Sequence, residues 1–255
     1  MSILKFIIKK AAPLPSPEDM DSVLFVGPHP DDIEIGAGAT AAKLASMGKK
    51  VAFLICTDGR YGDGYTAAKG EELIALRERE AKASAEMLGV SDVRFLRLSD
   101  GGYYSSEELK AGIAAVISEL KPDMIFCPDP DIISECHPDH LNVGRICKEI
   151  AFFLPYKSIA KQMGVEAVEL KGIAFYMSAK LNTYVDTRGF LDIQLKSIFE
   201  CHTSQFPRGG DDAKTTALYL KLRAYSFGIR KLSLTAEGFR VLGRTHMHCL
   251  PEAGE

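Results

Sequence analysis

Short apolar runs alternate with longer amphipathic stretches along the first part of the chain. The run SVLFVG lies between Asp21 and Pro28 and contains no charge, as is typical of a strand buried on both faces of a parallel sheet. Four such strands are predicted, over residues 22–27, 51–56, 93–98 and 124–127. Helices are predicted between and after them, over residues 36–47, 71–88, 106–120 and 140–153.

The second part of the chain is less regular. It predicts strands over residues 172–176 and 183–185 and helices over residues 191–201 and 212–225. Successive strand–helix units with short connections imply right-handed crossovers. We therefore predict an α/β fold, a Rossmann-like three-layer sandwich with a mostly parallel sheet and its ligand site at the carboxyl ends of the strands. No linker-like change of composition occurs, so we expect an N-terminal arm (1–20) and a single domain (21–255).

The composition is that of an ordinary globular protein and excludes several classes. The chain has 255 residues, 46% hydrophobic and 25% charged, and a net charge of −3, which gives no basic footprint for nucleic acid. No apolar run approaches the length of a membrane span, and we expect neither a signal peptide nor a membrane partner. None of the six cysteines forms a C-x-x-C pair, so reduced thiols and a cytoplasmic location are expected.

Polar residues gather in the loops that follow the predicted strands. These loops contain PHPDD at 28–32, TDG at 57–59, DGG at 100–102 and HPDH at 137–140. Three of the six histidines in the chain lie in them. Because the carboxyl ends of parallel strands share one edge of a sheet, we expect these loops to lie close together.

The histidines and aspartates of two of these loops suit a metal ion. His29 and Asp32 from one loop and His140 from the other would supply the three protein ligands of a catalytic zinc site, although this set also suits other divalent ions. His137 and Asp31 would lie beside the metal and stay free to move protons. An aspartate after a strand or a proline can instead cap the next helix. The presence of both halves at one edge favours the metal site.

A second motif overlaps the first loop and suggests a different function. Gly36, Gly38 and Ala41 match the dinucleotide-binding pattern G-x-G-x-x-G/A, and Asp58 has the spacing of a ribose-binding carboxylate. In that motif the first glycine follows the strand almost immediately, whereas here residues 28–35 intervene. We therefore interpret the glycines as sites of close helix packing and keep a dinucleotide-binding oxidoreductase as the alternative.

Taken together, the motifs resemble the PIG-L/LmbE superfamily of zinc-dependent N-deacetylases. The residues that carry the resemblance are PHPDD at 28–32 with Gly36 and Gly38, TDG at 57–59 and HPDH at 137–140, with supporting matches in RERE at 77–80, LGV at 88–90, DG at 100–101 and HTSQ at 202–205. The resemblance covers about residues 22 to 240. Within the superfamily, the loop pattern is most similar to that of the diacetylchitobiose deacetylase branch.

The resemblance implies hydrolysis of the acetamide of an N-acetylglucosamine-type sugar to acetate and a free amino sugar. The implied zinc ligands are His29, Asp32 and His140. Asp31 is implied as the general base and His137 as the acid. Arg77 and Asp100 are implied to hold sugar hydroxyls, although a solvated helix face and a turn start would also explain them. A non-catalytic sugar-binding protein is a further alternative, which the intact Asp31 and His137 disfavour.

The remaining candidates have less certain roles. Asp139 is expected either to orient the His137 ring and raise its pKa or to cap the following helix. His202 and His246 are expected to be structural, His202 at the end of a helix. The resemblance implies a homo-oligomer, trimer or hexamer, and makes His248 a candidate wall residue of the pocket in its own subunit or a neighbour's.

Overall fold

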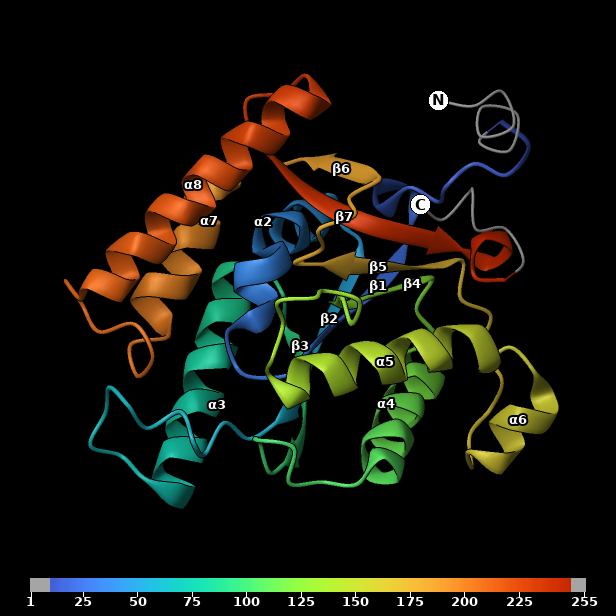
Figure 1. The fold of residues 1–255 in the computed structure, drawn as a ribbon, viewed down its shortest axis with the longest axis horizontal. Coiled ribbons are helices and arrows are strands. Elements are labelled where there is room, and N and C mark those ends of the chain that lie inside the picture. Colours follow the sequence, from blue (N-terminus) through green and yellow to red (C-terminus); the bar gives the residue numbers. More distant parts are fainter. Residues whose placement is uncertain (1–9, 249–255) are drawn as a thin grey trace.

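The computed structural model describes residues 10–248, and a seven-stranded mixed sheet forms its centre (Figure 1). The strands are β1 (Ser22–Gly27), β2 (Lys50–Thr57), β3 (Asp92–Leu98), β4 (Met124–Pro128), β5 (Gly172–Tyr176), β6 (Thr183–Asp186) and β7 (Ala236–Gly243). Their order is β3-β2-β1-β4-β5-β7-β6. The first five are parallel, and β7 pairs antiparallel with both β5 and β6.

Helices cover both faces of this sheet. They are α2 (Asp32–Ser46), α3 (Gly70–Met87), α4 (Ser106–Leu120), α5 (Pro138–Phe153), α6 (Lys157–Gln162), α7 (Leu191–Lys196) and α8 (Asp211–Lys231). Leu24 and Val26 of β1 belong to the core shared with α4 and α5, whereas Val23 and Phe25 belong to the core shared with α2 and α3. The predicted three-layer α/β sandwich is confirmed.

The main element that the sequence did not predict is β7. Its sequence AEGFRVLG contains two charged residues, so it has no continuous apolar run that would predict a strand. Both charges are buried and paired: Arg240 bonds to Asp129 in the loop after β4, and Glu237 bonds to backbone groups of α2. The other differences are smaller: α2 begins at Asp32, α6 was not predicted, α7 ends in a π-helical turn over Ser197–Cys201, and α8 continues to Lys231.

Glu237 supports a kink in α2. The backbone of Ala37 leaves the helical conformation, which frees N–H groups in the middle of the helix. The N–H groups of Ala39 and Thr40 donate to the Glu237 carboxylate over 3.2 and 2.7 Å, and the Gln194 amide donates to it over 2.9 Å. The carboxylate therefore acts as an N-cap for the second half of α2. It also joins β7 to α2, the helix that follows the loop PHPDD.

We expect Glu237→Ala to lower the free energy of unfolding by about 3 kcal/mol, because two buried N–H groups lose their acceptor. Urea denaturation followed by circular dichroism measures the change. Glu200→Ala, at an exposed position, is the matched control and should change stability by under about 0.5 kcal/mol. A loss as small as the control's would mean that the carboxylate does not support α2.

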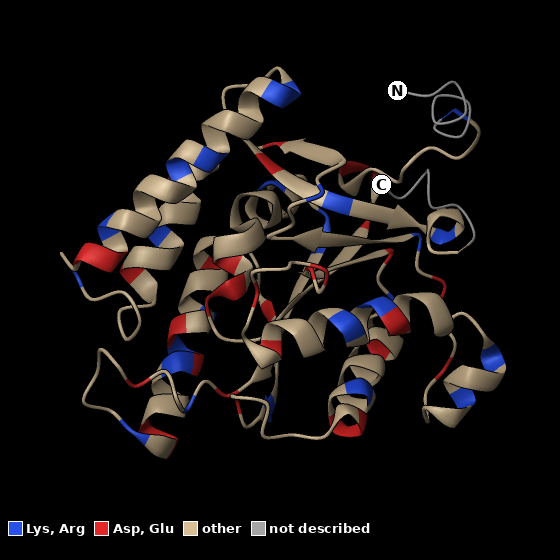
Figure 2. Ribbon diagram, viewed as in Figure 1, with Lys and Arg blue, Asp and Glu red and all other residues tan. Residues whose placement is uncertain are grey.

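Charged residues are spread over the molecule. Figure 2 shows Lys and Arg distributed over several helices rather than concentrated on one. Within residues 10–248, no helix combines the length and apolar character needed to cross a bilayer.

Candidate active site

The site lies where the direction of the sheet connections changes. α2 follows β1 and covers one face of the sheet, and α5 follows the neighbouring strand β4 and covers the other. The loops after such a strand pair diverge and leave a crevice at the carboxyl ends of the strands. His29, Asp31 and Asp32 line this crevice from the β1 side, and His137 and His140 line it from the β4 side.

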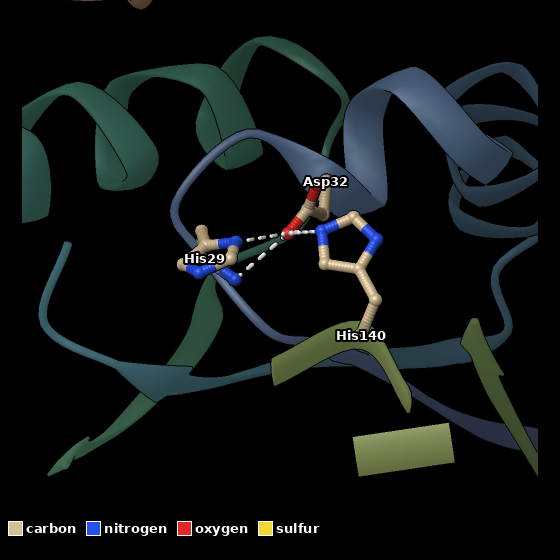
Figure 3. Close-up of side chains that lie close together, drawn as sticks. All are labelled: His29, Asp32 and His140. Carbon is tan, nitrogen blue, oxygen red and sulfur yellow. Dashed lines mark hydrogen bonds and ion pairs between the residues drawn. The ribbon is translucent and has the colours of Figure 1, made fainter. Parts of the chain in front are cut away.

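His29, Asp32 and His140 form the centre of the site (Figure 3). One carboxylate oxygen, Asp32 Oδ2, lies 3.0 Å from His29 Nδ1 and 3.3 Å from His140 Nε2. The same oxygen accepts the backbone N–H of His29 over 2.9 Å, which fixes the tight turn between β1 and α2. Tetrahedral zinc bonds of about 2.0 Å place ligand atoms about 3.3 Å apart. The donor set and its spacing therefore fit a divalent metal ion.

Each of the two histidines has a carboxylate at its other ring nitrogen. His29 Nε2 lies 3.0 Å from Asp139 Oδ2, and His140 Nδ1 lies 3.2 Å from Glu135 Oε2. Carboxylates in these positions fix the orientation of metal-binding histidines and increase their basicity. The motifs did not reveal Glu135, because it lies outside HPDH in the loop that precedes it.

Asp139 supports His29 and also contacts the loop after β3. Its carboxylate also accepts the backbone N–H groups of Gly101 and Gly102 over 2.7 and 2.8 Å. These bonds occupy the oxygens that a second combination, His29 with His137 and Asp139, would need for a metal. The Asp139 carboxylate lies 3.8 Å from His137 Nδ1, beyond hydrogen-bond distance, and faces His29, so it does not orient the His137 ring. Its charge does act to raise the His137 pKa, as expected, but its effect is weaker than that of the groups that lower it. The alternative that Asp139 caps α5 does not hold either, because the N-cap is His137.

The charges of the cluster favour a cation between its carboxylates. Burial lowers the pKa of His29, but the hydrogen bonds that its ring donates to Asp139 and Asp32 outweigh burial and raise that pKa to about 10. Burial raises the pKa of Asp32, but His140 and His29 outweigh it and hold that pKa well below the usual range. Both shifts favour positive charge beside the Asp32 carboxylate, which a bound divalent cation would supply.

Asp31 and Arg77 form a buried pair beside this cluster. Arg77 Nη2 donates to Asp31 Oδ2 over 3.2 Å and to the Pro30 carbonyl over 2.9 Å, and Nη1 donates to the Gly59 carbonyl over 3.1 Å. A Cβ atom at Gly59 or Gly62 would lie 2.4 or 2.5 Å from Nη1, so the guanidinium fits only because both residues are glycines. Arg77 thus does not lie on a solvated face.

The backbone and electrostatics of Asp31 set it apart from other aspartates of the chain. Its φ of 130° is a strained conformation for a residue with a side chain, of the kind found at functional sites. Burial raises its pKa to about 6, although the charge of Arg77 opposes this. A carboxylate with such a pKa is suited to take up a proton near neutral pH.

A cavity of about 260 Å³ opens onto these residues. It is lined by His29, Asp31, Tyr61, Gly62, Arg77, Asp100, Gly101, His137 and Gln205. Asp100 accepts the N–H of Tyr61 over 3.3 Å, and burial raises its pKa. The Gln205 amide donates to the Gly62 carbonyl over 2.7 Å and joins the loop before α8 to the cavity. Hollows of about 330 and 340 Å³ lie elsewhere, but neither has a histidine in its lining.

His137 is the exposed member of the histidine group. It is the N-cap of α5, where its Nδ1 accepts the N–H of Asp139 over 3.3 Å, and its side chain is 44% exposed. Its ring centre lies 4.6 Å from that of His29. Burial and the positive charges of His29 and His140 lower its pKa. The lowered pKa makes the protonated ring a better proton donor.

The other three histidines lie away from the metal cluster. His202 is buried with Nε2 3.2 Å from Glu34 Oε1, and His246 bonds to the backbone of Gly243. His248 packs on Phe152 at the far end of α5, about 21 Å along the helix from its start. His248 therefore does not line the cavity of its own chain, and its place in a neighbour's pocket stays a prediction.

The glycines of the dinucleotide motif are used for packing. A Cβ atom at Gly36 would lie 2.3 Å from the Tyr176 ring, and one at Gly38 would lie 3.1 Å from the Gln194 side chain. Asp58 is buried and its carboxylate bonds to Arg60. The motif leaves no open approach for a pyrophosphate at either glycine, which supports the packing interpretation over the cofactor interpretation.

Comparisons with known proteins identify the family of the chain. The family model PIG-L, described as GlcNAc-PI de-N-acetylase, matches residues 24–151. The chain is 32% identical to a diacetylchitobiose deacetylase of Thermococcus kodakarensis over 238 residues, which cover 92% of this chain and 88% of that protein. It is 34% identical over 166 residues to a 1D-myo-inositol 2-acetamido-2-deoxy-alpha-D-glucopyranoside deacetylase of Kineococcus radiotolerans, covering 52% and 46% of the two chains.

A solved structure agrees over nearly the whole fold. The N,N'-diacetylchitobiose deacetylase from Pyrococcus horikoshii, complexed with its inhibitor MPG, superimposes with a TM-score of 0.84 at 30% identity and covers 97% of this chain and 96% of its own. The family model extends over the loops that carry His29, Asp32 and His140. The predicted resemblance is confirmed, and the chain belongs to the PIG-L family as an N-deacetylase, a hydrolase.

Proposed function

We propose that this chain is a zinc-dependent deacetylase that hydrolyses the acetamide of an N-acetylglucosamine-type sugar and releases acetate and a free amino sugar. The observation that carries the proposal is the Asp32 carboxylate held between two imidazoles, with Asp31 and His137 beside it in one cavity. The names of relatives support the substrate class, since chitobiose-type and inositol-linked substrates both contain an N-acetylated glucosamine.

Three residues would hold the zinc ion: His29, Asp32 and His140. When bound, zinc would act as a Lewis acid that polarises the amide carbonyl and makes water more acidic. The hydrogen bond to Asp139 keeps the His29 imidazole turned toward Asp32, and Glu135 places a negative charge 3.2 Å from His140 Nδ1. Another divalent ion would also suit two imidazoles and one carboxylate.

Asp31 is the general base in this proposal. It lies within the turn that carries His29 and Asp32, lines the cavity and is kept in place by Arg77. Its carboxylate takes the proton of the water that attacks the amide carbon. The raised pKa of Asp31, caused by burial, brings its proton affinity close to the range that a base needs near neutral pH.

His137 is the acid that releases the amine. An amine leaves an amide carbon only when its nitrogen is protonated, and the His137 ring reaches the cavity from the β4 side. Burial lowers the pKa of His137, which favours transfer of its proton to the leaving nitrogen. Arg77 and Asp100 line the same cavity and are assigned to the sugar hydroxyls, with Asp139 acting through His29.

Acetate release tests the function directly. The purified chain, supplied with zinc, is incubated with N-acetylglucosamine, N,N'-diacetylchitobiose and N-acetylglucosaminyl-inositol, and acetate is measured. Release from at least one of them is expected. Binding of these sugars without any release would favour the non-catalytic alternative. Binding of a nicotinamide nucleotide with no release would favour the oxidoreductase.

Asp139→Asn is expected to weaken zinc binding by about 10- to 100-fold, because His29 loses the charged partner at Nε2. Competition with a chromogenic zinc chelator measures the affinity. The control is Asp92→Asn, whose carboxylate bonds to Arg94 at the opposite edge of the sheet and should leave the affinity unchanged. Equal affinity in both variants would contradict the supporting role of Asp139.

We also propose that the chain forms a homo-oligomer, trimer or hexamer. α8 packs on β7, β6 and α7 and lies on the outside of the molecule (Figure 1). Its outward face has four apolar residues, all at least 47% exposed: Leu218, Leu222, Tyr225 and Ile229. Their spacings of four and three residues are those of a helix–helix seam, which supports a second copy as the partner.

Leu222→Lys is expected to shift the chain to a smaller species, because a charge in the middle of this seam would have to be buried. Size-exclusion chromatography with light scattering gives the mass. Ala111→Lys, on the exposed side of α4, is the control and should keep the mass of the unaltered chain. An unchanged mass for Leu222→Lys would argue against α8 as the interface.

A further inference from the structure

Two exposed tyrosines stand together at the mouth of the cavity. Tyr61 is 58% exposed and Tyr103 is 73% exposed, and their ring centres are 5.8 Å apart with the rings inclined at 68°. Tyr61 belongs to the cavity lining, whereas Tyr103 extends the aromatic surface beyond it. Large aromatic side chains this exposed, beside a polar cavity, mark a surface on which a ligand can be placed.

The pair is anchored to residues of the active site. The N–H of Tyr61 donates to Asp100. Gly101 lies beneath both rings, since a Cβ atom there would be 3.3 Å from Tyr103 and 3.6 Å from Tyr61. The N–H of Gly101 in turn donates to Asp139, which holds His29. The two rings therefore have a fixed relation to the metal ligands rather than belonging to an unrelated loop surface.

The chemistry of the surface favours a sugar ring. A pyranose has C–H groups on its faces and hydroxyls around its edge, so it can cover an aromatic ring while its hydroxyls stay in water. An edge-to-face pair leaves ring surface free for such a contact. The remaining lining of the cavity is dominated by charged and polar side chains suited to the N-acetylated sugar itself.

We propose that Tyr61 and Tyr103 form a second subsite that stacks against a further hexopyranose ring, linked to the one that is deacetylated. The proposal rests on the proposed function and extends it: the preferred substrate is at least a disaccharide. The N-acetylated ring occupies the cavity beside Asp31 and His137, and the next ring lies over the tyrosines at its mouth.

The test compares two substrates on the same enzyme preparation. The specificity constant kcat/KM is measured for N,N'-diacetylchitobiose and for N-acetylglucosamine, and their ratio is taken. This ratio does not depend on the fraction of correctly folded protein, so partial misfolding of a variant cannot mimic the effect. Tyr61→Ala and Tyr103→Ala should each lower the ratio by about tenfold, and Tyr103→Phe should keep it, because stacking needs the ring and not the hydroxyl.

Tyr219→Ala removes an equally exposed tyrosine on α8 and should leave the ratio unchanged. An unchanged ratio in both cavity-mouth alanine variants would overturn the subsite. So would an equal loss of the ratio in Tyr103→Phe. If the unaltered chain released acetate from no sugar at all, the proposed function itself would fail, and that result differs from active enzyme with an unchanged ratio.

Discussion

Asp31→Asn is expected to bind zinc as the unaltered chain does and to release acetate about 1000-fold more slowly. The zinc ligands remain, because the Asp32 carboxylate and both imidazoles are untouched. An asparagine has the shape of an aspartate and can still accept from Arg77, so the strained turn should persist. It cannot take the proton of the attacking water, and loss of a general base costs about 100- to 10,000-fold in rate.

The measurement combines zinc content with the initial rate of acetate release. Asp19→Asn, at an exposed position before β1, is the control and should leave both unchanged. Acetate release by Asp31→Asn at the rate of the control would exclude Asp31 as the base. Loss of zinc from Asp31→Asn would mean instead that Asp31, and not Asp32 alone, binds the metal.

His140→Ala is expected to lose zinc and, with it, all measurable activity. His140 supplies one of three donor atoms, and its Nε2 lies 3.3 Å from the Asp32 oxygen. Loss of a supporting residue outside the ligand set costs about 10- to 100-fold in metal affinity, and loss of a ligand should exceed that. Alanine is the best helix former, so α5 itself should be preserved.

The comparison variant is His137→Ala, from the same motif and the same helix end. It should retain zinc and lose activity, because His137 is assigned to proton transfer and not to the metal. Zinc content after dialysis, measured by elemental analysis, separates the two. About one zinc per chain in His140→Ala would contradict the ligand set, and zinc loss in His137→Ala would point to the alternative group that contains Asp139.

Strands with uniform burial were predictable, and the strand with buried charges was not. β1 was predicted at its observed bounds because both of its faces are covered, so every residue in the run is apolar or small. β7 was missed because Glu237 and Arg240 interrupt its apolar pattern. Their partners, in α2 and in the loop after β4, are far away in the sequence, so no local pattern reveals that these charges are satisfied.

For the site, residues within short motifs were predictable, but contacts between loops were not. His29 and His140 could be placed together because both follow strands that end at one edge of the sheet. Asp139 was expected either to orient its sequence neighbour His137 or to cap the helix, whereas the first turn of α5 directs its carboxylate to His29 and to the backbone of the loop after β3. Glu135 was missed, and Gln205 of the HTSQ motif was given no role, because their contacts depend on how irregular loops fold back.

The central claim is that one metal ion, bound by His29, Asp32 and His140, supports hydrolysis of an N-acetylated sugar. A zinc titration of the chelator-treated protein tests it most directly, with acetate release from N,N'-diacetylchitobiose as the signal. We predict no release without metal, a linear rise as zinc is added, and a plateau at about one zinc per chain. Full release from the metal-free protein, or no release at any amount of zinc, would contradict the account.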